Sequence, residues 1–219
     1  MRFFSPSALR VWQRNRDVFL ALSTSEVPGL IAEPLLVLLA MGVGLGAYVI
    51  MPDGQDYMEF IAPGIIAGYG MFSATFECTF GSFVRMDYQK TYDAIIASPL
   101  SVEDVVAGEI FWGATRAFIN TAAVLLIATA FGLVQTPMAL LALPMGLLSG
   151  LMFASIAFVF TSIAPAISTF NYYFTLVITP MFYFSGVFFP LDSFPEIVQK
   201  LSWIAPLTPV TAVMRAVVQ

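Results

Sequence analysis

The sequence predicts an all-α integral membrane protein. Of its 219 residues, 59% are hydrophobic and only 11% are charged, and the mean hydropathy is +0.86. In a soluble domain about a quarter of the residues carry charge. The apolar residues also run in stretches of about twenty or more, the length at which a helix crosses the hydrocarbon core. We therefore expect a single transmembrane domain over residues 1–219, built from five spanning helices joined by polar segments.

The composition argues against most enzyme classes and against nucleic-acid binding. The chain has no histidine and one cysteine, Cys78, so the usual zinc and general-base groups are missing. The net charge of −5 leaves no basic face for a nucleic acid. Lys90-Thr91 resembles the end of a P-loop, but the preceding FVRMDYQ has no glycine to cradle phosphates. We expect no metal, cofactor or nucleotide to be bound by this chain.

The first element is a predicted amphipathic helix over residues 5–22 that lies in the membrane interface. Ser5 and Pro6 supply a cap and a first-turn proline. The helix has a polar stripe and an apolar side, formed by Arg10, Gln13, Arg14 and Asp17 and by Leu9, Trp12, Phe19 and Leu20, respectively. A frayed cytoplasmic tail is the alternative interpretation.

Five apolar segments qualify as membrane spans by their length. They cover residues 28–50, 60–84, 109–134, 137–162 and 168–189. Six of the nine basic residues lie before the first span or just after the second: Arg2, Arg10, Arg14, Arg16, Arg85 and Lys90. Because basic residues gather on the cytoplasmic side, we expect the N-terminus and the segment 85–108 to be cytoplasmic. The loop at 51–59 and the chain after residue 189 then face outward.

Glycines inside the spans predict close contacts between helices. Gly64 and Gly68, and likewise Gly146 and Gly150, are four residues apart, so each pair lies on one helix face. Such small residues let neighbouring helices approach closely within a membrane. We interpret both pairs as packing faces.

For the cytoplasmic segment 85–108 the sequence predicts a short helix, a break and a second helix. From Arg85 to Ala97 one apolar face is formed by Tyr88, Tyr92 and Ile95. Ser98-Pro99 ends this helix, because the residue before proline is pushed out of the helical region. Ser101 with Asp104 then predicts a capping box that starts the helix of the third span. A surface helix-turn of no particular purpose is the alternative.

Three ionisable residues fall inside the predicted spans, at a similar depth in the inner half: Glu33, Glu77 and Arg116. An unpaired charge there is costly. We expect Arg116 to pair with Glu77, Glu33 or both, so that swapping the charges of Glu77 and Arg116 would restore function lost in either single variant. A proton or ion pathway is the alternative, although no chain of acids continues toward the outside.

After the fifth span we expect an external re-entrant or surface segment over residues 190–209. Ser193 and Glu196 predict a capping box there, and Pro206 and Pro209 close the segment. The helix between them is too short to cross the membrane. Just before it lie Tyr183, Phe184 and Phe188, which are candidates to contact a substrate. An outer belt of aromatic residues explains them equally well.

The order of these parts resembles the membrane subunit of type-2 ABC exporters, and within them the nodulation protein J group, which is associated with lipo-chitooligosaccharide export. The resemblance covers essentially the whole chain. Its most specific parts are FVRMDYQKTYDAIIASPLSVEDVVAGEI and SGVFFPLDSFPEIVQKLSWIAPLTPVTAVMRA. It implies a multi-pass protein of the bacterial inner membrane that works as a homodimer or heterodimer, with ATP and magnesium bound by a separate ATPase subunit.

The resemblance also assigns roles to the two polar segments. It implies a coupling helix that contacts the ATPase through Tyr88, Lys90, Thr91, Tyr92, Asp93 and Ile95. It implies an external re-entrant helix that includes Ser193, Glu196, Ile197, Leu201 and Trp203. Such permeases have six spans, whereas this sequence stops at MRAVVQ, where we expect the sixth to begin; we therefore expect the sequence to be truncated.

We conclude from the sequence that the chain is the permease subunit of an ATP-driven exporter for an amphipathic substrate: a lipo-oligosaccharide, polysaccharide, lipid or drug. A self-sufficient secondary transporter would show inverted repeats with matching broken helices, and none is evident. A membrane-embedded enzyme acting on lipid-linked sugars is disfavoured by the missing histidine and by the lack of an acid cluster on one membrane face.

Overall fold

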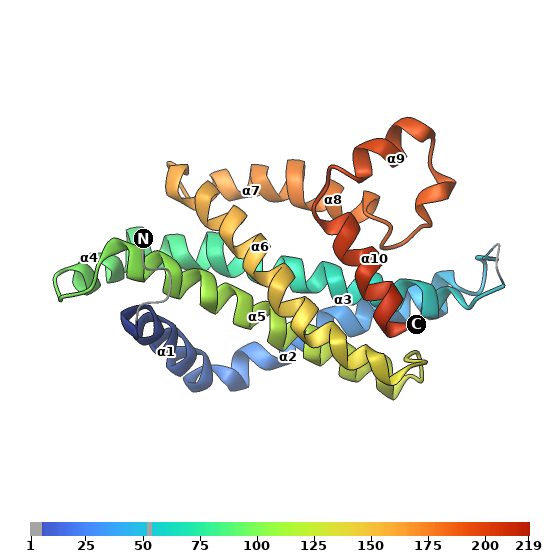
Figure 1. Cartoon of the computed structure of the whole chain (residues 1–219), viewed down its shortest axis with the longest axis horizontal. Helices are drawn as coiled ribbons and strands as arrows, with labels where there is room; N and C mark the ends of the chain where they lie inside the picture. Colours follow the sequence, from blue (N-terminus) through green and yellow to red (C-terminus); the bar gives the residue numbers. More distant parts are fainter. Residues whose placement is uncertain (1–5, 52–53) are drawn as a thin grey trace.

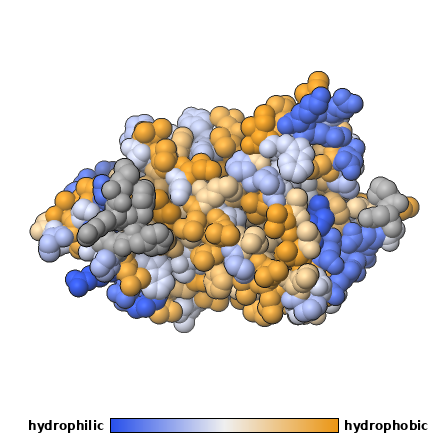
Figure 2. Space-filling view, viewed as in Figure 1, coloured by the Kyte–Doolittle hydropathy of each residue, from blue (hydrophilic) through white to orange (hydrophobic). Residues whose placement is uncertain are grey.

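The computed structural model describes residues 6–51 and 54–219, and these residues form helices without a strand. Figure 1 shows an elongated bundle in which α1 and α4 lie at one end and α9 lies at the other. Figure 2 shows that the middle of this face is mostly hydrophobic, while hydrophilic residues gather near both ends. The all-α membrane fold predicted from the composition is confirmed. Arg2 and Ser5 lie outside the described residues.

Helix α1 (Pro6–Ala21) lies against the bundle. Its inward face consists of Ala8, Val11, Asn15 and Phe19, which follow helical spacing. Gly108 of α5 permits the contact, because an added Cβ would meet the Val11 side chain and the Ala8 carbonyl. Leu9 and Leu20 are about half exposed, at 52% and 58%. The helix therefore has an apolar outer surface suited to the interface as well as a face packed on α5.

The first span is longer at its inner end than predicted. α2 covers Ser23–Val37 and continues through wide π-helical turns at Leu38–Leu45. The prediction began this span at Pro28, but Pro28 and Pro34 both lie inside the helix. Prolines are tolerated inside membrane helices where neighbours satisfy the freed backbone groups. The extension brings Glu26 into the helix.

The second and third spans form the centre of the bundle. α3 (Tyr57–Phe76) continues as helix through π-helical turns at Glu77–Gly81 and Val84–Tyr88, so Arg85 and Tyr88 belong to it. After a break, the helix α4 covers only Thr91–Ile96. α5 covers Val102–Ala130, so the helix begins directly after Ser101 as predicted, seven residues before the apolar span expected from residue 109. The predicted capping box is confirmed: Ser101 Oγ accepts from the Asp104 amide and Asp104 accepts from the Ser101 amide.

The predicted three-turn helix from Arg85 to Ala97 is wrong. Lys90 adopts a left-handed backbone, with φ of 51°, which interrupts the helix between Tyr88 and Thr91. A left-handed residue turns the chain and cannot continue a right-handed helix. Tyr88 therefore belongs to the end of the second span, where it is 64% exposed and contacts the Phe83 ring. Tyr92 and Ile95 belong to α4.

The fourth and fifth spans complete the bundle. A 3-10 turn at Pro137–Leu141 leads into α6 (Ala142–Ile163). The fifth span is α7 (Thr169–Tyr173), a π-helical turn (Phe174–Ile178) and α8 (Thr179–Phe184), ending five residues earlier than predicted because Gly186 turns the chain with φ of 75°. By length and composition, three helices in the described part are fit to span a membrane: Ser23–Leu45, Val102–Ala130 and Pro137–Ile163.

Both predicted glycine pairs lie at helix contacts. A Cβ on Gly64 would lie 2.8 Å from the Val187 backbone, and one on Gly68 would meet the Phe182 ring. On α6, Gly146 and Gly150 face α5 in the same way. The packing faces predicted from the spacing are confirmed.

The external segment differs from its prediction. A 3-10 turn at Leu191–Ser193 precedes α9 (Glu196–Ser202), whose N-cap is Pro195 without a side-chain cap. The predicted Ser193–Glu196 capping box is therefore wrong, since Ser193 is taken into the preceding turn. Gln199 instead donates to the Phe194 carbonyl, 2.8 Å away.

The final helix α10 (Leu207–Val218) leaves α9 at an angle of 87°. Pro209 does not close the external segment: it lies in the first turn of α10, where a proline is tolerated. Gln219 donates to the Glu59 carbonyl over 2.7 Å, and the Val218 carbonyl accepts from Gln135. The end of α10 thus lies beside the start of α3. Together α9 and α10 are long and apolar enough for a span, but they bend by 87° at their junction, as either a broken span or a re-entrant segment does.

Candidate functional site

A buried acid–base network holds together the end of the bundle that carries α4. Glu109 of α5 is fully buried and accepts from three side chains: Arg85 Nη2 at 2.5 Å, Asn15 Nδ2 at 3.0 Å and Ser82 Oγ at 3.1 Å. Arg85 also pairs with Glu77, with Nη1 2.8 Å from Oε1. One carboxylate of α5 thus joins α1 to the end of the second span.

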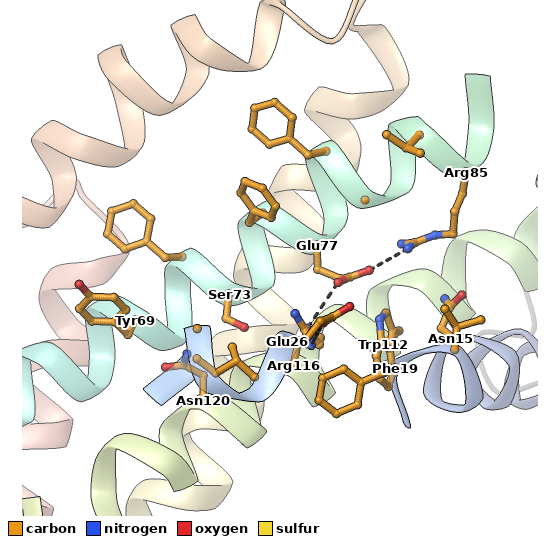
Figure 3. A pocket seen from close by; sticks show the side chains of 18 of the residues that line it. Asn15, Phe19, Glu26, Tyr69, Ser73, Glu77, Arg85, Trp112, Arg116 and Asn120 are labelled. Atoms are coloured by element: carbon orange, nitrogen blue, oxygen red, sulfur yellow. Dashed lines mark ion pairs between the residues drawn. The ribbon is translucent and has the colours of Figure 1, made fainter. Parts of the chain in front are cut away.

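The network continues to Arg116. Its Nε lies 3.4 Å from Glu77 Oε2 and its Nη1 lies 2.7 Å from Glu26 Oε2. The guanidinium also lies over the Phe19 ring of α1, 4.7 Å from its centre. Figure 3 shows Glu77 between Arg116 and Arg85, so that it bridges the two cations. Four helical elements therefore meet around two arginines and three glutamates.

Sequence reasoning brought Glu77 and Arg116 together but misplaced Glu33. Because α2 begins at Ser23, the acid at the depth of Arg116 is Glu26. Glu33 lies about two turns farther along α2, where it accepts a hydrogen bond of 3.4 Å from Tyr69. Glu109 and Arg85 were missed because they stood at predicted span boundaries, where charge is expected. Glu109 and Arg85 could have been recognised as intramembrane charges if the helices of the second and third spans had been extended past them.

Helix α4, the predicted coupling helix, reaches this network through Tyr92. Tyr92 of α4 is only 7% exposed, and its hydroxyl lies beside Ser82, Arg85 and Glu109. Burial and the Glu109 carboxylate raise the pKa of Tyr92 well above its usual range, so the hydroxyl stays protonated. Asp93 and Ile96 of the same helix are exposed. α4 therefore has an inner side fixed to the bundle and an outer side open to a partner.

The remaining predicted coupling residues lie around the turn before α4. Lys90 pairs with Asp87, with Nζ 3.2 Å from Oδ1, and Thr91 lies next to Gln89. Both are at the surface or partly exposed. Lys90 and Thr91 are thus accessible, whereas Ile95 is half-buried.

A cavity of about 860 Å³ adjoins the network, between α1, α2, α3 and α5. Because of the helical spacing, polar and aromatic residues line the cavity in two separate stripes. On α3, Tyr69, Ser73 and Glu77 form a polar stripe, while Phe72, Phe76 and Phe80 form an aromatic stripe beside it. Figure 3 shows Ser73 and Glu77 projecting toward Arg116 of α5. The cavity is amphipathic, with a polar side and an aromatic side.

The predicted outer aromatic residues continue this aromatic side. Phe182 contacts both Phe72 and Tyr69, with ring centres 5.0 Å and 6.2 Å apart. Tyr183 and Phe188 contact Phe182 in turn. Phe188 is only 4% exposed, whereas Tyr183 and Phe184 are about half exposed. Of the three predicted substrate contacts, the structure leaves Tyr183 and Phe184 accessible and packs Phe188 inside.

The predicted residues of the external segment lie mainly at the surface. Ile197, Leu201 and Trp203 are 59–73% exposed, and Ser193 and Glu196 are exposed as well. Behind them, Arg215 of α10 donates to the Gly186 carbonyl at 2.9 Å and lies 4.1 Å from the Phe60 ring centre. In the described residues no group of His, Cys, Asp and Glu has the arrangement of a metal site.

A helical membrane bundle with an amphipathic cavity, in which one side chain links a short surface helix to a buried charge network, fits a transport protein of the permease class. Residues 11–218 match the ABC-2 type transporter family. The chain belongs to this family of ABC transporter permeases.

Individual relatives agree with this assignment. The chain is 38% identical to nodulation protein J of Sinorhizobium fredii over 91% of its own length and 76% of the relative's. It is 36% identical to nodulation protein J of Rhizobium meliloti, over 95% and 80% of the two chains. It is 22% identical to the inner membrane transport permease YadH of Escherichia coli over 90% and 77%. No solved structure gives a significant match.

Proposed function

We propose that the chain is the permease subunit of an exporter in the bacterial inner membrane, with its N-terminus and α4 in the cytoplasm. A separate ATPase subunit binds α4 and carries ATP and magnesium. Two permease copies, identical or related, form the functional unit. The substrate is amphipathic, of the lipo-oligosaccharide, polysaccharide, lipid or drug type. The relatives named nodulation protein J favour the first of these.

The burial of Tyr92 is the observation that carries this proposal. α4 is only six residues long and too short to be stable alone, so its position depends on the anchor that Tyr92 makes beside Arg85 and Glu109. A partner that pulls on the exposed side of α4 would move this anchor. The same two residues connect to Glu77 and Arg116, which line the cavity. Movement at α4 is thereby carried to the cavity.

The test separates ATPase binding from coupling. Ile96→Asp places a charge on the exposed side of α4 and should reduce co-purification of the ATPase. Tyr92→Ala leaves the exposed side intact, so the ATPase should still co-purify while substrate-dependent ATP turnover and transport fall at least tenfold. Glu103→Gln, at an exposed position in the first turn of α5, is the control and should retain both. Transport by the chain in proteoliposomes without any ATPase would overturn the proposal in favour of a secondary transporter.

A further inference from the structure

The cavity contains a second polar level, separate from the ion-paired network. It lies one to two turns along α3 from Glu77, toward the outer side. Its members come from three helices: Glu33 of α2, Tyr69 and Ser73 of α3, and Asn120 of α5. The network already uses Glu26, Glu77 and Arg116 for pairing. Within the second level, Glu33 accepts a hydrogen bond from Tyr69 and so links α2 to α3, whereas Ser73 and Asn120 take no part in the ion-paired network.

Two members of this level are left with free hydrogen-bonding atoms. Asn120 is only 3% exposed, and its Oδ1 has no hydrogen-bond partner among the described residues. Ser73 Oγ likewise lacks one in the described part of the chain. A buried amide or hydroxyl without a partner costs about 1–3 kcal/mol. Since both side chains line the cavity, a ligand placed there would supply the missing bonds.

The charges of the cavity indicate the kind of head group that fits. Its lining has three arginines and three glutamates: Arg14, Arg85, Arg116, Glu26, Glu33 and Glu77. Arg85 and Arg116 are each held by two carboxylates. At the second level the charged member is Glu33, and the others are neutral donors and acceptors. A phosphate would find no free cation there, whereas a neutral head group with hydroxyl or amide groups would find four partners.

The aromatic stripe adjoins this level along its whole length. Phe72 and Phe76 lie on the same helix, α3, as Tyr69 and Ser73. Each phenylalanine comes three residues after one of the polar residues, so it lies on a neighbouring face of the helix. Phe174 stacks beside them, with its ring centre 6.4 Å from that of Phe72. Phe76 is 57% exposed, so the stripe is open to a hydrocarbon chain. Polar and apolar contacts are thus available side by side, as an amphipathic molecule requires.

We propose that Glu33, Tyr69, Ser73 and Asn120 form a binding subsite for the neutral, hydroxyl-bearing head group of the transported molecule, with its hydrocarbon chain along Phe72 and Phe76. This inference rests on the proposed function for the identity of the ligand as the transported molecule. The subsite lies at the inner cavity, apart from Tyr183 and Phe184. Asn120 is its central recognition residue because it is the most deeply buried member that lacks a partner.

The test uses photolabelling in membrane vesicles that contain the chain and its ATPase. The probe is maltotetraose carrying a dodecyl chain with a diazirine. Two comparison probes carry the same chain, one with a hydroxyl alone and one with a phosphate. Labelling of the peptide that contains Phe72 and Phe76 is measured by mass spectrometry. We expect the sugar-bearing probe to label it several-fold more strongly than either comparison probe.

Variants identify the residues responsible. Asn120→Leu and Ser73→Ala should each reduce labelling by the sugar-bearing probe about three- to tenfold, the value of one or two hydrogen bonds, and leave labelling by the hydroxyl probe unchanged. Asn171→Leu on α7 and Ser155→Ala on α6, which do not line the cavity, are the matched controls. Equal labelling by all three probes would show an unselective apolar cavity and overturn the proposal. So would variants that reduce labelling by the sugar-bearing probe and by the hydroxyl probe to the same extent.

Two measurements on the same vesicles distinguish failure of the subsite proposal from failure of the proposed function. Labelling is measured without ATP, and co-purification of the ATPase is measured separately. Selective labelling that depends on Asn120 without any bound ATPase would leave the subsite standing and refute the ATP-driven mechanism. A bound ATPase with unselective labelling would refute the subsite alone.

Discussion

The two halves of the bundle are held together by different physical means. The inner half, next to α4, relies on paired charges that join α1, α2, α3 and α5 through Glu109, Arg85, Glu77 and Arg116. The outer half relies on shape: Gly64 and Gly68 admit the Val187 backbone and the Phe182 ring, and a single arginine caps backbone carbonyls. Charge pairs can rearrange between discrete partners, whereas close-packed contacts resist displacement. The charge pairs thus lie in the half of the bundle next to α4, where close contacts such as that of Gly108 with Val11 add to them.

The largest effect is expected from removing the acid at the centre of the inner half. Glu109→Leu removes one of the two carboxylates that hold Arg85 and leaves the Asn15 amide without its acceptor. Breaking a buried charge pair costs about 3–5 kcal/mol, and the remaining pair with Glu77 offsets part of it. We expect loss of monodisperse protein in size-exclusion chromatography after mild detergent extraction. Glu103→Gln in the same helix should behave like the unchanged chain. Normal yield and melting temperature for Glu109→Leu would show that the network adds no stability.

A charge swap is expected to fail because Glu77 has two arginine partners. In the double variant Glu77→Arg with Arg116→Glu, the new arginine faces Arg85 and the new glutamate faces Glu26. The swap should therefore recover no more folded protein than the worse single variant, as judged by the same chromatography. Asp87→Lys with Lys90→Asp, an exposed pair, is the control and should be close to neutral. Full recovery by the first swap would mean that Glu77 and Arg116 form an isolated pair.

In the outer half, Arg215→Gln should loosen the re-entrant segment. The variant loses a charged hydrogen bond to the Gly186 carbonyl and the contact with the Phe60 ring, together about 1.5–3 kcal/mol. We expect faster proteolysis within residues 186–206 in spheroplasts, while the cytoplasmic segment keeps its normal resistance in inverted vesicles. Faster cleavage on both sides would contradict the separation of the two halves.

Close packing in the outer half predicts sensitivity to one methyl group. Gly64→Ala places a Cβ 2.8 Å from the Val187 backbone, and such overpacking costs about 1–3 kcal/mol. Gly44→Ala is the matched control, because a Cβ there has no neighbour within 4 Å. We expect a lower melting temperature for the first variant and little change for the second. Equal melting temperatures would show that α3 and the Val187 segment adjust freely.

The smallest effect is expected at the start of α5. Ser101→Ala removes the side-chain acceptor for the Asp104 amide, which costs about 1 kcal/mol. Amide hydrogen exchange in the first turn of α5 should rise about fivefold. Ser101→Thr retains the hydroxyl and should keep the exchange slow. An unchanged rate in Ser101→Ala would indicate that packing of α5 alone holds this turn.

The sequence was most informative where the signal is local. Ser101 with Asp104 predicted the cap of α5, and the glycine spacings predicted two packing faces, because each depends on residues within one helical turn. Predictions failed where a local rule was overridden. Pro28 was read as a helix start but lies inside α2, and Ser193 was read as a cap but lies in the preceding turn. The break at Lys90 depends on a backbone conformation that its residue type rarely adopts.

The candidate site was only half predictable. Glu77 and Arg116 were evident because charges inside an apolar span require partners. Which partners they have depends on how each helix is rotated about its axis, and periodicity does not specify the rotation of one helix relative to another. Hence Glu26 was not foreseen as a partner of Arg116, and Glu109 was taken for a boundary residue.

By itself the sequence determined that this protein is a helical membrane protein and, through its resemblance to the permeases of ABC exporters, which family it belongs to, because hydrophobic length and the order of motifs are properties of the chain alone. Only the tertiary structure decided that Glu33 lies with Tyr69 rather than with Arg116, and that Tyr92 lies beside Arg85 and Glu109. The contact between Glu33 and Tyr69 joins residues that are far apart in the sequence. The position of Tyr92 determines which side of the short helix α4 faces the bundle. The free energy of these contacts comes from mutual burial and charge pairing that exist only once the helices have packed.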